Sequence, residues 1–384
     1  MRNKTFRRLA AAGAALSLVA AACGTEAEVA AAGISEDAPT IAVTTNILGD
    51  VVQNIVGDLA NVETIMPVGA DPHDFQASAQ QVALVGDADA VVINGAFFEE
   101  GLWDMIEATE ADGIPVHHSI DLVSTLEFGE DSHGHEEGEE GDVHDDEEEG
   151  EEHDDEEGDE HDDEEGEEHD DEEGDEHDDE EGEEHDDEEG EEHDDEEGDE
   201  HGHEEGGADP HFFTDPVRMA DAVEGITAFL VETVDGLDAE AVQSNADAYV
   251  AELGALDAEI TEILSGLSDE QRVLITNHEV FGYFADQYDF EVVGTVIPSG
   301  STLDGTSGGA LAELAEEIEH EGVPAIFADV SASDELINAL AGEVGEVAVV
   351  ELFTESLGDA DSEGGTYIEM LRTNATRMAD ALGS

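Results

Sequence analysis

An acidic repeat interrupts this chain and limits what its middle can fold into. From Glu151 to Gly166 the sequence reads EEHDDEEGDEHDDEEG, two turns of an eight-residue repeat that recurs with small variations. Between Val143 and Phe212 there is no valine, leucine, isoleucine, methionine or large aromatic residue, so this segment cannot bury a core. Eight residues at 100° each leave about 80° over per repeat, so the histidines do not line one helix face. We therefore predict that residues 129–207 form a disordered, acidic, histidine-rich insertion.

Charge narrows the range of partners. The chain has 384 residues, enough for two or three domains, and a formal net charge of -100. Of its 108 acidic residues, 52 lie between Glu130 and Glu205. Beyond residue 22 the only basic side chains are four arginines, at 218, 272, 372 and 377. Such a surface repels nucleic acid and anionic substrates, so we expect cationic partners.

The N-terminus has the pattern of an export signal. Residues 1–22 combine a basic start, an apolar run from Leu9 to Val19 and the small residues before Cys23. The sole cysteine stands directly after these small residues, as in the lipobox of bacterial lipoproteins, where it carries the lipid. We predict lipidation at Cys23 and a tether over residues 23–38. The alternative is secretory cleavage that leaves a free thiol. No other apolar run is long enough to span a membrane.

Two series of alternating strands and helices follow, so we predict an α/β fold with two lobes, each a small parallel sheet flanked by helices. The first lobe comprises residues 39–128 with 208–238, and the insertion lies inside it. One long rigid helix, residues 239–267, joins it to the second lobe, residues 268–384. Predicted strands are TIAVTT from Thr40, ADAVVING from Ala88, RVLITN from Arg272, FEVVGTVI from Phe290, AIFADV from Ala325 and VAVVEL from Val347.

Four residues outside the repeat are candidate metal ligands. His73 and His211 each end an Asp-Pro-His triplet, and the proline restricts the backbone before the imidazole. His278 follows the strand RVLITN at its carboxyl end, where open α/β sheets place their ligands. Glu355 follows VAVVEL in the same way. Three imidazoles and one carboxylate suit a four-coordinate zinc ion, although a nearby aspartate or water is an alternative fourth ligand.

These segments resemble the metal-specific solute-binding lipoproteins of bacterial ABC importers, the zinc and manganese group (metal-binding cluster A-I). The resemblance covers Ile41 to Leu382 apart from the repeat. The matching motifs, in the family's order, are GADPHDFQASAQQVALVGDADAVVINGAFFEEGL, DPHFFTDP, TNHEVFGYFADQY, IPSGSTLDGTSGGALAEL, ELFTESLGD and GGTYIEMLRTNATRMADAL.

The resemblance implies two α/β lobes joined by a long helix, with one metal ion between them. The family's histidine ligands fall on His73, His211 and His278, and its acidic ligand, usually aspartate, falls on Glu355. Zinc members tend to have histidine at the third position and an acidic, histidine-rich insertion before the second, whereas manganese members usually have glutamate at the third. Zinc is therefore the expected ion, with manganese as the alternative.

Other residues receive weaker interpretations. His117 and His118 either form an auxiliary metal site or are solvated. Phe97, Phe98 and Trp103 either guard the cleft or, as we expect, pack in a core. Glu279 beside His278 does not indicate a metallohydrolase, because the chain has no HExxH motif.

The insertion contains eleven histidines flanked by carboxylates. It is interpreted as a weak auxiliary zinc collector, as a solvating segment that only keeps the protein soluble, or as a calcium or general cation sponge that needs no histidine. The candidate weak ligands are His133, His135, His144, His153, His161, His169, His177, His185, His193, His201 and His203.

Together these features predict a lipid-anchored receptor on the outer face of the cell membrane. It binds Zn²⁺, or alternatively Mn²⁺, and delivers the ion to the membrane permease of an ABC importer. We expect a monomer that catalyses no reaction and binds no nucleic acid. A metal-dependent surface adhesin is the alternative from another functional class.

Overall fold

The computed structural model describes residues 38–128, 207–303, 305–330, 335–345 and 347–383. The signal segment, Cys23, most of the tether and the eleven histidines of the insertion lie outside these residues. No helix within the described ranges combines the length and the apolar character needed to cross a bilayer.

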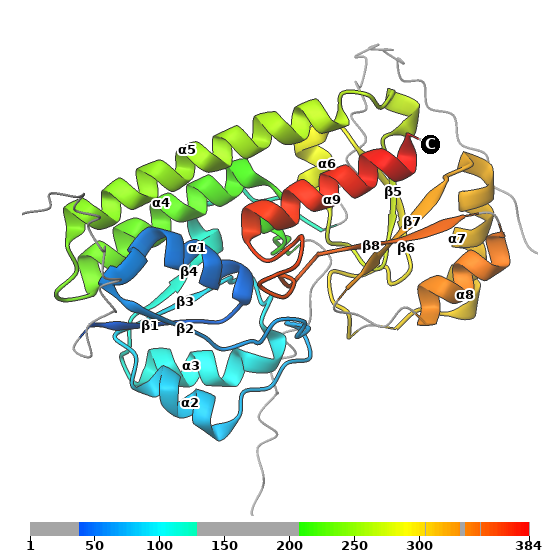
Figure 1. The fold of residues 1–384 in the computed structure, drawn as a ribbon. Helices are drawn as coiled ribbons and strands as arrows, with labels where there is room; N and C mark the ends of the chain where they lie inside the picture. The colour runs from blue at the N-terminus through cyan, green and yellow to red at the C-terminus, as the bar shows by residue number, and fades with distance from the viewer. Residues whose placement is uncertain (1–37, 129–206, 304, 331–334, 346, 384) are drawn as a thin grey trace, which may run out of the picture. The chain divides into compact units, whose positions relative to one another are not determined.

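Two four-stranded parallel sheets form the framework, as Figure 1 shows. The first has the order β2-β1-β3-β4, with strands β1 (Thr40–Val43), β2 (Asn61–Thr64), β3 (Ala90–Ile93) and β4 (Val116–His118). The second has the order β6-β5-β7-β8, with strands β5 (Val273–Thr276), β6 (Glu291–Thr295), β7 (Ala325–Asp329) and β8 (Ala348–Leu352).

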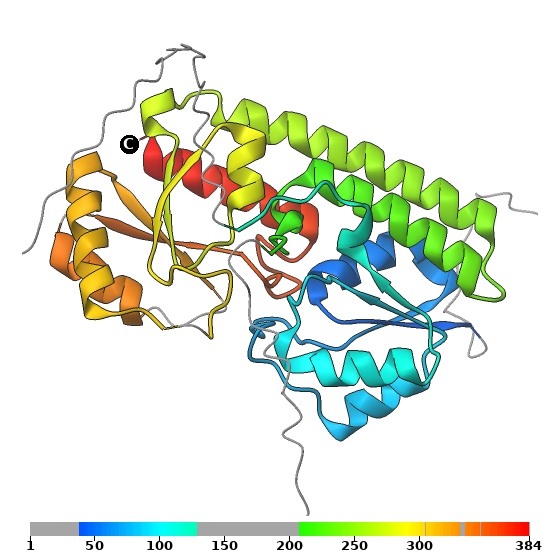
Figure 2. The same cartoon turned by 180° about the vertical axis from the view of Figure 1, so that it is seen from behind.

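Helices connect successive strands and cover both faces of each sheet (Figures 1 and 2). They are α1 (Asn46–Val56), α2 (Ala79–Gly86), α3 (Trp103–Ala111), α4 (Pro216–Thr233), α5 (Ala239–Leu264), α6 (Gly282–Tyr288), α7 (Gly308–Glu321), α8 (Glu335–Val344) and α9 (Tyr367–Leu382). The predicted α/β class, with two small parallel sheets flanked by helices, is confirmed.

Both faces of each sheet are buried because alternate side chains of a strand point to opposite sides. In β1, Ile41 and Val43 belong to one core, whereas Ala42 belongs to the core formed with α2 and α3. In β7, Phe327 joins the first of these cores, and Ile326 faces a third core against α7 and α8. This two-sided burial explains why the central strands are continuous apolar runs in the sequence.

Helix α5 packs along one side against α1, α4 and α9. Its buried residues, from Val242 to Leu264, recur every three or four positions and form one stripe. The 26 residues of α5 extend over about 39 Å at the standard rise per residue. It ends at Leu264, three residues before the predicted boundary, where Ser265 and Gly266 follow and glycine is a poor helix former.

One hydrophobic core therefore extends across both sheets. Side chains of the first sheet, of α5 and of the second sheet, such as Val92, Leu253 and Phe327, belong to the same buried cluster. Helix α9 packs beside α5 and also contacts β8 (Figures 1 and 2). The two lobes thus share one core rather than being held only by a connecting segment.

Because the two lobes share one core, a substitution in α5 should destabilise both. Leu253→Ala removes a fully buried side chain of α5 and is expected to lower the free energy of unfolding by about 2–5 kcal/mol. Chemical denaturation should show one shifted transition, because both sheets depend on the same core. Glu252→Ala, at an exposed position of the same helix, should change the free energy of unfolding by no more than about 0.5 kcal/mol. A transition split in two would contradict the shared core.

Candidate metal centre

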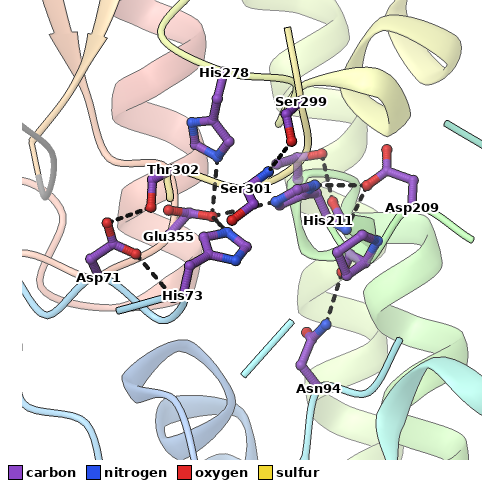
Figure 3. A network of polar contacts seen from close by, with 12 residues as sticks. Asp71, His73, Asn94, Asp209, His211, His278, Ser299, Ser301, Thr302 and Glu355 are labelled. Carbon is purple, nitrogen blue, oxygen red and sulfur yellow. Dashed lines mark hydrogen bonds and ion pairs between the residues drawn. The ribbon is translucent and has the colours of Figure 1, made fainter. Parts of the chain in front are cut away.

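Four predicted ligands converge on one point (Figure 3). One ligand atom from each of His73, His211, His278 and Glu355 lies within 4.8 Å of all the others. The Oε1 atom of Glu355 is 2.9 Å from Nε2 of His73, 3.3 Å from Nε2 of His211 and 3.1 Å from Nε2 of His278. All three imidazoles are 0% exposed and Glu355 is 2% exposed. Bulk water is therefore excluded from the point where the four side chains meet.

The two Asp-Pro-His triplets fold into the same turn. In each, the aspartate Oδ1 accepts a hydrogen bond from the histidine backbone N–H two residues later, at 2.9 Å for Asp71 with His73 and at 2.9 Å for Asp209 with His211. An aspartate that bonds the backbone two residues ahead stabilises a tight turn, and proline limits its central position. Each turn holds its imidazole on a backbone of restricted freedom.

The other two ligands come from the second sheet. His278 stands two residues beyond β5, and Glu355 stands three residues beyond β8. Asn46, the first residue of α1, fixes the turn after Glu355: its Nδ2 donates to Oγ of Ser356 at 3.0 Å, and its Oδ1 accepts from the Leu357 N–H at 2.7 Å. The acidic ligand is thereby attached to the lobe that supplies His73.

In two of the imidazoles, a carboxylate contacts Nδ1, the ring nitrogen that does not face Glu355. Nδ1 of His73 lies 2.9 Å from Oε1 of Glu100, and Nδ1 of His211 lies 2.7 Å from Oδ1 of Asp209. Such contacts orient a ring and raise its basicity as a ligand. Nδ1 of His278 and Oε2 of Glu355 are buried and have no hydrogen-bond partner among the described residues.

The buried charges compensate one another. Burial alone lowers the pKa of His73, but the carboxylates of Glu355 and Glu100 outweigh burial and raise this pKa to about 10. Burial likewise lowers the pKa of His211, and Asp209 and Glu355 raise it above its usual value. Burial favours the neutral form of Glu355, yet His278 and His73 hold its pKa well below the usual range. Without metal, the site is therefore an ionised carboxylate facing protonated imidazole.

A divalent ion fits this donor set. Tetrahedral zinc has ligands at about 2.0–2.1 Å, which places the ligand atoms about 3.3 Å apart. The contacts of Glu355 Oε1 with the three Nε2 atoms, at 2.9–3.3 Å, already have this spacing. The largest ligand separation, within 4.8 Å, requires only a modest contraction around the ion.

The weaker predictions separate into packing and surface roles. Phe98 is 1% exposed, and its ring centroid lies 5.3 Å from that of His73 and 5.5 Å from that of His211, so it packs against two ligands. His117 stacks on a phenylalanine of α4, and His118 contacts Glu110 at 3.1 Å. Neither belongs to a metal-binding group among the residues that the structure covers.

The residues that hold the ligands were not predicted from the sequence. Asp71 and Asp209 are in the quoted triplets, and their spacing of two residues before a histidine was an available signal. Glu100 carried no such signal, because it contacts His73 across 27 positions. Thr302, which donates from Oγ1 to Oδ2 of Asp71 at 2.6 Å, comes from the other lobe (Figure 3). Contacts of this kind depend on the tertiary fold.

Comparison with known proteins identifies a family and relatives of this chain. Residues 41–381 match the family described as "Zinc-uptake complex component A periplasmic" (ZnuA). The chain is 25% identical over 370 residues to the manganese-binding lipoprotein MntA of Halalkalibacterium halodurans, covering 96% of this chain and 95% of that protein. It is 25% identical over 351 residues to the zinc-binding protein TroA of Treponema pallidum, covering 90% and 89%.

Solved structures share the fold. The periplasmic zinc-binding protein TroA from Treponema pallidum aligns with a TM-score of 0.65 at 23% identity, covering 90% of this chain and 99% of that one. A crystal structure of ZnuA aligns with a TM-score of 0.62 at 20% identity, covering 90% and 100%. The family match spans both sheets and all four converging residues. The chain therefore belongs to the ZnuA family of solute-binding proteins, the metal-binding receptors of ABC importers, which are not enzymes.

Proposed function

We propose that this receptor binds one Zn²⁺ through Nε2 of His73, His211 and His278 and a carboxylate oxygen of Glu355, and that it delivers the ion to its permease. The observation that carries the proposal is the convergence of three buried imidazoles on one buried carboxylate. Imidazole-rich sites with few ligands suit zinc, whereas manganese prefers more oxygen ligands.

Manganese is the second candidate, and one observation favours it. Oε2 of Glu355 is buried without a hydrogen-bond partner among the described residues, so the carboxylate is able to offer both oxygens and raise the coordination number. The relatives carry names of both kinds, manganese-binding for MntA and zinc-binding for TroA.

The N-terminal segment is proposed to anchor the receptor to the membrane. Cys23 is proposed to carry the lipid, with residues 23–38 as the tether outside the membrane. The first lobe (39–128 with 208–238), the linking helix (239–267) and the second lobe (268–384) are proposed to act as one monomeric receptor. Support comes from the signal pattern and from relatives named as lipoproteins.

The insertion is proposed to hold additional weakly bound zinc through its eleven histidines. An imidazole with neighbouring carboxylates is a suitable donor set for a divalent ion. The two ends of the insertion meet, because the Phe128 N–H donates to the Gly207 carbonyl at 3.0 Å. The insertion therefore leaves and re-enters the first lobe at one place.

Metal content and ligand replacement test the main site. Protein purified without added metal should contain zinc by elemental analysis, and zinc should displace manganese in a competitive titration. His278→Ala should weaken zinc binding by about two orders of magnitude or more, because it removes a ligand.

The matched control for that variant is His118→Ala, which removes a histidine that lies outside the group of four converging ligands and whose Nε2 is 3.1 Å from Glu110. Its affinity should equal that of the unchanged protein. Equal affinity in the His278→Ala protein would reject the ligand assignment, and a preference for manganese would reject zinc as the cargo.

Zinc affinity should increase with pH. Zinc binds the deprotonated imidazole, and the pKa of His73 is raised to about 10, so its proton must leave at every pH below that value. Each displaced proton should strengthen apparent affinity about tenfold per pH unit. Chelator competition between about pH 6 and 8 measures this slope, and titration calorimetry in buffers of different ionisation enthalpy counts the protons. An affinity independent of pH would contradict protonated imidazole in the metal-free site.

Deleting Glu130–Glu205 in favour of a short glycine-serine link should leave the main site intact, because Phe128 and Gly207 already meet. The zinc stoichiometry should decrease from several ions to one. Changing the eleven histidines to glutamine should remove the extra zinc but leave calcium binding unchanged. If the intact and deleted proteins both bind a single zinc with equal affinity and uptake, the insertion has no collecting role.

A further inference from the structure

The ends of the acidic insertion form a short antiparallel stem next to the metal centre. Residues 126–128 pair with residues 207–209 through the Phe128 N–H to the Gly207 carbonyl, at 3.0 Å, and the Asp209 N–H to the Leu126 carbonyl, at 2.9 Å. We call these six residues the stem.

A tyrosine hydroxyl completes the stem. The Tyr283 hydroxyl donates to the Asp209 carbonyl at 2.6 Å and accepts from the Leu126 N–H at 3.1 Å. In an ordinary antiparallel pair these two backbone groups bond each other directly; here the hydroxyl lies between them. Tyr283 belongs to α6 and is 0% exposed. Burial raises its pKa, so the hydroxyl keeps the proton that it donates.

Arg218 supports this arrangement. Its guanidinium lies 4.9 Å above the Tyr283 ring centroid, and its Nε donates to the Ser124 carbonyl, just before the stem, at 3.0 Å. Its other nitrogens contact Asp215 at 2.7 Å and Asp286 at 2.6 Å. The ring of Tyr283 and the strand that enters the stem are therefore held by the same cation.

The stem is also part of the support of the metal centre. Asp209 bonds Tyr283 through its carbonyl. Its Oδ1 holds both Nδ1 and the backbone N–H of His211; Figure 3 shows these two residues side by side. On the other strand, the Phe128 ring lies 6.3 Å from the His211 ring. It also fills the space beside Gly300, where a Cβ would lie 2.1 Å from Phe128 Cζ. Separation of the two strands would displace the groups that position His211.

Electrostatic repulsion within the acidic insertion favours separation of the two strands of the stem. The insertion carries 52 acidic residues between Glu130 and Glu205, and like charges that are close together repel one another. The range of this repulsion is about 10 Å at 0.1 M salt and about 3 Å at 1 M. Among the described residues, two direct backbone hydrogen bonds and the Tyr283 hydroxyl join the two strands.

We propose that Tyr283 is a positioning residue for the metal centre: by bonding both strands of the stem, its hydroxyl keeps the charge repulsion of the insertion from displacing Asp209 and His211. This role rests on the proposed function of His211 as a metal ligand. It predicts that ion retention depends on Tyr283, on the insertion and on ionic strength together, although Tyr283 does not touch the ion.

The test is the zinc dissociation rate of full-length Tyr283→Phe, measured with excess chelator. At low salt the rate should increase about tenfold, which corresponds to about 1.4 kcal/mol, because the two hydrogen bonds of the hydroxyl are lost. At molar salt, or when a short link replaces Glu130–Glu205, the rate should return toward that of the unchanged protein. Tyr288→Phe is the matched control, because Tyr288 also lies in α6 and its hydroxyl bonds Asp257 at 3.2 Å, away from the stem.

A metal-free measurement separates this proposal from the function on which it rests. Hydrogen exchange of peptides covering residues 126–128 and 207–209 should be faster in Tyr283→Phe than in Tyr288→Phe at low salt. If the two variants release zinc and exchange hydrogen equally, or if the effect of Tyr283→Phe is the same with the short link, the proposal is wrong. If hydrogen exchange of the stem is faster in Tyr283→Phe but the unchanged protein binds no zinc, the proposed function is wrong. The role of Tyr283 in holding the two strands of the stem together is then still supported.

Discussion

The buried contact between Glu355 and three imidazoles is the interaction on which the centre depends. A charge in the interior is costly unless it is paired, and here one carboxylate oxygen lies 2.9–3.3 Å from three Nε2 atoms. His73 and His211 precede the long helix α5 in the sequence, whereas His278 and Glu355 follow it. Ligands from both sheets thus meet at this carboxylate, and without a metal, protons on His73 and His211 supply compensating charge.

Much of this arrangement was predictable from the sequence. Doubly buried strands such as β3 and β7 are apolar runs, and polar residues after the carboxyl ends of strands gather at one edge of a parallel sheet. Strand β2 was missed because it is a partly exposed edge strand of four residues, Asn61–Thr64, with little apolar character. Glu100, Thr302 and Tyr283 were missed as supports because their partners are 27, 231 and 74 positions away, and no local pattern encodes such distances.

The acidic insertion and the metal centre meet at Asp209, whose backbone belongs to the stem and whose carboxylate holds His211. A long insertion adds little closure cost once its ends are fixed, so its length is compatible with a folded lobe. The negative charge of the insertion has a different effect, because repulsion between its carboxylates opposes the hydrogen bonds that close the stem. Arg218 is one of the four arginines beyond residue 22. Its guanidinium contacts Ser124 just before the stem, Asp215 at the start of α4 and Asp286 in α6.

The shared hydrophobic core has a consequence for the lifetime of the protein. A ligand that binds only the folded state stabilises it in proportion to the logarithm of ligand concentration over the dissociation constant. Because the side chains around the ion are attached to sheets that unfold with one core, this added stability extends to the whole folded unit rather than to one lobe. Proteases that attack unfolded chains should therefore degrade the metal-bound receptor more slowly than the metal-free receptor. When metal is scarce, the metal-free molecules should have a shorter lifetime.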